Sequence, residues 1–165
     1  MSPVGCTPPN REDDEYALSM APGLLMRDDV RQALEIGPNS SPDDRTIDIT
    51  TTGRSSGLSR RIEIVFYRIG DSIYLSGVPA PRRRDWLANL SAEPHFTFHL
   101  KHGVVADLDA VATVITDEAE RRRLLAPLVD QFNERRGQDS EWPRAELDEW
   151  VAGSPLARVD FVELG

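Results

Sequence analysis

The stretch IDITTTGRSSGLSRRIEIVFYRI, residues 47–69, decides the fold. Two segments rich in β-branched and aromatic residues, 47–52 and 60–69, flank a short turn bracketed by Gly53 and Gly57. Residues of these types favour strands, and glycine permits the backbone conformations that tight turns require. The stretch therefore predicts two antiparallel strands joined by a tight turn.

Further strand-like segments follow this hairpin, with no helix-length crossover between most of them. They lie at residues 73–78, 95–101, 104–115 and 156–162. A sheet of about six mostly antiparallel strands hides its edges by closing into a barrel. We therefore expect a β-barrel with peripheral helices, in the α+β class.

Helical spacing of apolar residues predicts the helices. They are expected at 24–36, at 82–90, from Asp117 onward and as one turn at 146–151. Pro127 lies inside the third of these, so a kink or two short helices are expected there. Residues 39–44 are expected to form a loop.

The chain has 165 residues, which suits one domain. We expect residues 1–22 to be a disordered tail and residues 23–165 to form a single domain. Cys6 is the one cysteine, which excludes an intramolecular disulfide and a cysteine-rich zinc site. No signal sequence and no apolar run long enough to span a membrane is visible, so a cytoplasmic location is expected.

The net charge of −9 argues against binding to nucleic acid, which depends on neutralising phosphates. The charge is nevertheless uneven, because residues 51–101 carry 8 basic and 4 acidic side chains. The basic ones are Arg54, Arg60, Arg61, Arg68, Arg82, Arg83, Arg84 and Lys101. A solvated face would explain this cationic region, and so would a site for a phosphate or carboxylate.

Two segments favour the anion site. The turn at 53–57 offers backbone N–H groups, hydroxyls and Arg54, and the alternation of side chains lets only one of Arg60 and Arg61 reach it. Arg82–Arg84 stand at a predicted helix start, where they oppose the helix dipole unless an anion lies between them.

The three histidines, His95, His99 and His102, invite a metal interpretation. Residues four apart on a strand lie about 13 Å from each other, too far to chelate one ion. We therefore expect surface histidines and no metal site. No Ser/His/Asp grouping can be assembled from the sequence, since the serines at Ser55 and Ser56 lack the G-x-S-x-G pattern.

The sequence resembles the deazaflavin-dependent nitroreductase family of the flavin/deazaflavin oxidoreductases over about residues 24–165. The resemblance lies in the pattern T-T-G-R-x-S-G followed by an arginine, here Thr51–Gly57 and Arg60. A second motif of tryptophan, Asn-Leu and a nearby proline is matched by Trp86, Asn89, Leu90 and Pro94. The closing segment 154–161 is also similar to members of the family.

The resemblance implies a split β-barrel that binds the anionic deazaflavin coenzyme F420. By resemblance, the phosphate and tail would be held by Arg54, Ser55, Ser56, Gly57 and Arg60. The ring system would lie along Ser76, Gly77, Trp86 and Asn89, and would be bordered by Ile62 and Glu63. Many relatives have lysine at Ser55, proline at Glu63 and tyrosine at Leu87. The missing lysine would be compensated by Arg61, Arg82, Arg83 and Arg84.

The activity implied is hydride transfer from reduced F420 to a small conjugated acceptor: a quinone, a nitroaromatic or an enone. A non-catalytic F420 carrier and an FMN-dependent enzyme on the same fold remain alternatives. The proton donor is not identified, with Tyr67, Tyr74, Glu63 and solvent as candidates. We expect an open pocket against the deazaflavin, lined partly by Glu63 or Val65. A homodimer is left open.

Overall fold

The computed structural model describes residues 27–37, 40–80, 84–136, 141 and 143–162. The expected tail at 1–22, the beginning of the first expected helix, and Arg82 and Arg83 lie outside the described residues.

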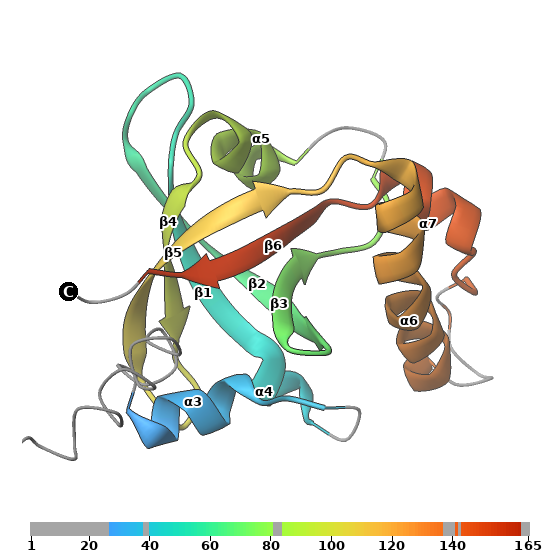
Figure 1. The fold of residues 1–165 in the computed structure, drawn as a ribbon, viewed down its shortest axis with the longest axis horizontal. Helices are drawn as coiled ribbons and strands as arrows, with labels where there is room; N and C mark the ends of the chain where they lie inside the picture. Colours follow the sequence, from blue (N-terminus) through green and yellow to red (C-terminus); the bar gives the residue numbers. More distant parts are fainter. Residues whose placement is uncertain (1–26, 38–39, 81–83, 137–140, 142, 163–165) are drawn as a thin grey trace, which may run out of the picture.

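The described strands form a closed antiparallel barrel in the order β1-β2-β3-β6-β5-β4 (Figure 1). Their bounds are β1 Thr46–Thr52, β2 Ser59–Ile69, β3 Ser72–Ser76, β4 His95–Leu100, β5 Ala106–Val114 and β6 Leu156–Phe161. The predicted hairpin is present, with Thr52 of β1 opposite Ser59 of β2. The expectation of a six-stranded barrel with peripheral helices is therefore confirmed.

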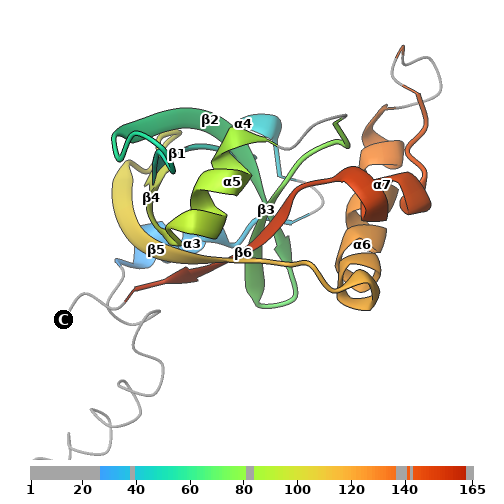
Figure 2. The same ribbon diagram turned by 90° about the horizontal axis from the view of Figure 1, so that it is seen from above.

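The helices surround the barrel. Their bounds are α3 Asp28–Leu34, α4 Pro42–Arg45, α5 Asp85–Ala92, α6 Glu118–Arg136 and α7 Leu147–Gly153. Helices α3 and α5 lie at opposite ends of the barrel (Figure 1), while α6 and α7 pack together at its side (Figure 2).

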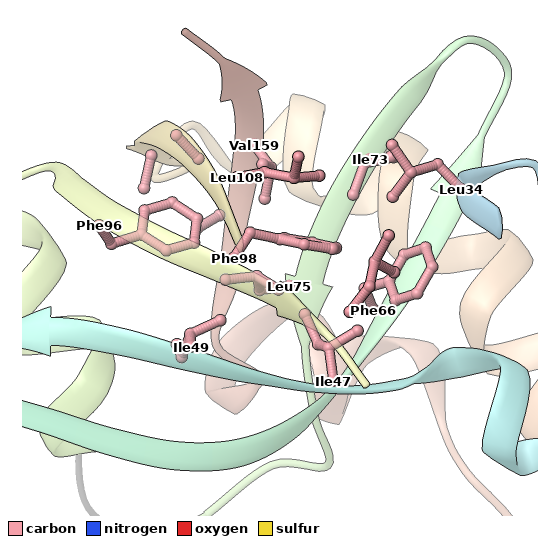
Figure 3. Packing of buried hydrophobic residues seen from close by; sticks show 14 of the residues in the cluster. Leu34, Ile47, Ile49, Phe66, Ile73, Leu75, Phe96, Phe98, Leu108 and Val159 are labelled. Carbon is pink, nitrogen blue, oxygen red and sulfur yellow. The ribbon is translucent and has the colours of Figure 1, made fainter. Parts of the chain in front are cut away.

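The barrel interior is filled by alternate residues of each strand (Figure 3). Ile47, Ile49, Phe66 and Phe98 are all 0% exposed. The rings of Phe66 and Phe98 meet edge to face, with centroids 5.3 Å apart. This packed interior fixes which residues of β1 and β2 face inward, and so which can reach the barrel mouth.

A second apolar cluster lies under α6 and α7, outside the barrel. Its members include Leu124, Leu125, Leu128, Trp150 and Leu156. Of the two alternatives expected at Pro127, a kink or two short helices, the second is wrong, because α6 is a single helix through Pro127. Burial of leucines on both sides of Pro127 offsets the cost of about 3 kcal/mol that an interior proline carries.

The segment expected to be a loop at 39–44 includes the start of a helical turn, α4. Ser41 and Asp44 form a reciprocal capping box, and Pro42 occupies the first helical turn. These three residues favour a helix start, because they satisfy free N–H groups and preset the backbone. Helix α5 begins at Asp85, with Arg84 as its N-cap residue, rather than at residue 82.

Candidate functional site

A cavity of about 320 Å³ is lined by residues of the β1–β2 turn, β2 and α5. Figure 1 shows this turn and α5 at the same end of the barrel. The lining residues of the cavity are Thr51, Gly53, Arg54, Ser55, Ser56, Arg60, Ile62, Asp85, Trp86 and Asn89. Both motifs singled out in the sequence, the glycine-bracketed turn and the Trp-x-x-Asn segment, therefore meet at one place. We refer to this cavity as the mouth cavity.

The turn that forms one wall is held closed by its own backbone. The Gly53 N–H donates to the Leu58 carbonyl at 2.8 Å, and the Gly57 N–H donates to the Gly53 carbonyl at 2.8 Å. Gly57 has a φ of 72°, in the left-handed region that favours glycine. A Cβ at Gly53 would lie 2.6 Å from Ser56 Oγ, so a larger residue there would displace this hydroxyl.

Asn89 connects α5 to this turn. Its Oδ1 accepts hydrogen bonds from the Arg54 backbone N–H at 3.0 Å and from Arg54 Nη1 at 3.3 Å. Its Nδ2 donates to Thr51 Oγ1 at 3.2 Å. Asn89 is only 5% exposed and its bond to Thr51 is buried, so these contacts fix the position of the turn.

Two guanidinium groups line the mouth cavity. Arg54 has a loose, solvent-exposed ion pair with Asp85 at 3.7 Å, and such pairs contribute little. Arg60 has no carboxylate partner within the described part of the chain. Alternation places Arg60 on the cavity side of β2, whereas Arg61 faces outward and donates to Asp48 Oδ2 at 2.9 Å. As expected, only one of these two arginines reaches the turn.

The remaining predicted site residues lie elsewhere. Glu63 faces outward and pairs with Lys101, and Gly57 is an exposed turn residue outside the cavity lining. Ser76 is buried, and its hydroxyl donates to the Pro155 carbonyl at 2.7 Å. Gly77 lies against the guanidinium of Arg84, which lines a different cavity.

The candidate proton donors are also outside the mouth cavity. Tyr67 and Tyr74 pack in the apolar cluster under α6 and α7, where burial raises the pKa of Tyr67. The Tyr67 phenol therefore stays protonated at neutral pH. Neither Glu63 nor Val65, the residues expected to border a substrate pocket, lines the mouth cavity.

An ion-pair group that the sequence does not reveal joins the outward faces of β1 and β2 to Lys101, the residue after β4. Lys101 Nζ donates to Asp48 and to Glu63, and Arg61 donates to Asp48. The hydrogen bond from Lys101, followed by that from Arg61, holds the pKa of Asp48 below its ordinary value of 3.8. The hydrogen bonds from Lys101 to Asp48 and to Glu63 raise the pKa of Lys101.

His99 also differs from expectation, because its side chain is 8% exposed rather than on the open surface. It lies between Thr50 Oγ1 and Asp107 Oδ1, at 2.7 Å from each. The strand alternation places all three side chains on the outward face, but only the cross-strand register brings them together. Within the described residues, no group of three or more His, Cys, Asp or Glu side chains could hold a metal ion.

None of the helices in the described ranges has the length and apolarity needed to cross a bilayer.

The fold is shared with solved structures of low sequence identity. A conserved hypothetical protein from Mycobacterium tuberculosis matches with a TM-score of 0.55 and 15% identity, over 82% of this chain and 81% of that chain. A Listeria innocua protein described as a pyridoxamine 5'-phosphate oxidase matches with a TM-score of 0.50 and 11% identity, over 81% of this chain and 91% of that chain. At these identities, the likeness shows the barrel fold alone.

No curated protein sequence matches the chain. The model of one family, described as F420H(2)-dependent quinone reductase, matches residues 31–140. The matched range contains the turn at 53–57, Arg60 and the Trp-x-x-Asn segment, the same motifs that carry the resemblance to deazaflavin enzymes. The chain belongs to the F420H(2)-dependent quinone reductase family, whose members are F420-dependent oxidoreductases.

Proposed function

We propose that the mouth cavity binds the phosphate-bearing part of F420 and that the protein passes a hydride from reduced F420 to a small conjugated acceptor. The observation that carries this proposal is the meeting of Arg54, Arg60 and the closed glycine turn at one cavity. When bound, reduced F420 supplies the hydride. The chain supplies binding and orientation.

The residues of the cavity fit a phosphate. Arg60 offers a guanidinium without a carboxylate partner in the described part of the chain, and Arg54 is held in place at its backbone by Asn89. Ser55 and Ser56 add hydroxyls and backbone N–H groups on the same turn. Guanidinium and backbone donors of this kind are the usual partners of phosphate oxygens.

Trp86 and Ile62 give the same cavity an apolar wall. An aromatic ring system anchored through its phosphate could bury part of its surface against these side chains. The acceptor classes proposed are quinones, nitroaromatics and enones, all of which accept a hydride at an electron-poor conjugated carbon or nitro group.

Anaerobic turnover tests the proposal. Protein and reduced F420 are mixed with menadione, a nitroaromatic or a cyclic enone, and the recovery of the oxidised F420 absorbance is followed against a protein-free control. We expect acceleration by at least one acceptor class. Tight F420 binding without acceleration by any acceptor would favour the carrier alternative, and binding of FMN in preference to F420 would favour the FMN alternative.

A further inference from the structure

A second cavity, of about 490 Å³, lies between α5, the β5–α6 connection and the end of α7. It is lined by Ala80, Arg84, Leu87, Val114, Ile115, Thr116, Arg121, Ala152, Gly153, Ser154 and Pro155. It shares no lining residue with the mouth cavity, since α5 presents Trp86 and Asn89 to one and Leu87 to the other. We refer to it as the side cavity.

The two arginines of the side cavity differ in their hydrogen bonding. The Arg121 guanidinium donates to the carbonyls of Ile115 at 3.0 Å, Val151 at 2.9 Å and Ser154 at 2.6 Å. Arg121 is therefore satisfied by the backbone and has a structural task. Arg84, in contrast, makes no hydrogen bond or ion pair within the described part of the chain, and its Nη1 is buried without an acceptor.

Ser154 is a third polar residue of the side cavity. Ser154 is only 4% exposed, and its Oγ also has no hydrogen-bond partner among the residues that the structure describes. None of the described lining residues is acidic, and Leu87, Val114, Ile115 and Pro155 make apolar walls. Buried donors left unpaired destabilise a fold, so such groups call for an explanation.

A small anion with an apolar ring fits both the unpaired polar groups and the apolar walls of the side cavity. Its charged oxygens would accept from the Arg84 guanidinium, which lines the cavity and whose planar form favours two oxygens that share one charge. Its ring would contact the apolar walls. The volume lies within the range of about 300–1,000 Å³ that is common for small-molecule sites.

We propose that the side cavity is a binding site for small aromatic anions, in which Arg84 recognises a carboxylate or the oxyanion of a hydroxyquinone. This site is separate from the phosphate site of the mouth cavity. It is occupied without the coenzyme, so its test does not depend on the proposed function.

Calorimetric titration of the full, coenzyme-free chain tests the proposal with two naphthoquinones of similar size. 2-Hydroxy-1,4-naphthoquinone is an anion at neutral pH, whereas menadione carries a neutral methyl group at the same ring position. We expect the anion to bind one per chain and about tenfold more tightly than menadione, as one charge-assisted contact allows. Equal affinities for the two compounds would overturn the proposal.

Variants then locate the site. Arg84→Gln should weaken binding of the anion about tenfold without affecting menadione. Arg123→Gln, a control on the open surface of α6 where Arg123 is 67% exposed, should leave both affinities unchanged. Unchanged anion affinity in Arg84→Gln, or an equal loss in Arg123→Gln, would contradict the role of Arg84.

Two further results guard against a folding artefact. Ala152→Trp should abolish binding by filling the side cavity while Arg84 is kept. Arg84→Met should leave the free energy of unfolding unchanged or raise it, since it removes an unsatisfied buried donor. Full binding in Ala152→Trp, or loss of binding in Arg60→Gln, would place the ligand elsewhere and overturn the assignment.

Discussion

Replacement of Asn89 by alanine tests whether α5 holds the phosphate-binding turn in place. The change removes the hydrogen bonds that Asn89 accepts from the Arg54 backbone N–H and guanidinium and the one that it donates to Thr51. Each of the two neutral bonds contributes roughly 0.5–1.5 kcal/mol, and the third is long and partly exposed, so it adds less. We expect the free energy of unfolding to fall by about 2–3 kcal/mol in urea titrations.

The same variant should bind F420 about tenfold more weakly, because a loosened turn must be reordered on binding. Asn133→Ala is the matched control. Asn133 also makes two hydrogen bonds, to the backbone of Ala145 at 2.7 and 3.1 Å, but it lies on α6 outside the mouth cavity. The Asn133→Ala variant should be less stable than the wild type and should keep the wild-type affinity for F420. Wild-type affinity in Asn89→Ala, or an equal affinity loss in Asn133→Ala, would contradict the positioning role of Asn89.

Three other predictions concern stability. Gly53→Ala should lower the free energy of unfolding by about 1–2 kcal/mol in urea titrations, because the added Cβ displaces the Ser56 hydroxyl that accepts a hydrogen bond from the Leu58 N–H. An unchanged free energy of unfolding would show that the turn can relax. Phe98→Ala should cost about 3–5 kcal/mol by the same measurement, because Phe98 is 0% exposed at the barrel centre, and a loss under 1 kcal/mol would contradict close packing there. Ionised Asp48 stabilises the fold above its unfolded pKa, and this contribution is lost as the pH falls from above 3.8 through the lower native pKa. Thermal unfolding of Asp48→Asn should therefore show a smaller loss of Tm on acidification than the wild type does, and parallel curves would argue against the ion pair with Lys101.

The barrel could be predicted because local signals agree with one another. β-Branched runs, glycine turns and the alternation of apolar and polar residues each indicate the strands. The alternation of side chains along β2 by itself places Arg60 and Arg61 on opposite faces. The meeting of the two motifs at the mouth cavity could be predicted only through the family resemblance. The bond between Asn89 and Thr51 joins residues 38 positions apart, and no periodicity encodes such a pairing.

The differences from expectation share one physical cause, which is contact between residues that lie far apart in the sequence. Pro127 stays inside one helix because the surrounding leucines are buried, and His99 is sheltered because the register sets it between Thr50 and Asp107. Arg84 lies apart from Arg54 and Arg60 because it lines the side cavity, which contacts α5 on a different side from the mouth cavity. None of these can be inferred from the spacing of residues along the chain.

The central claim is that Arg60 in the mouth cavity anchors the coenzyme. Fluorescence titration with F420 tests it most directly when Arg60→Ala is compared with Arg61→Ala, a neighbour of the same charge on the opposite face of β2. We expect one F420 per wild-type chain and weaker binding with added salt. Arg60→Ala should lower the affinity for F420 about ten- to a hundredfold, whereas Arg61→Ala should change it within about twofold. Wild-type affinity in Arg60→Ala at low salt, or an equal loss in both variants, would contradict the central claim.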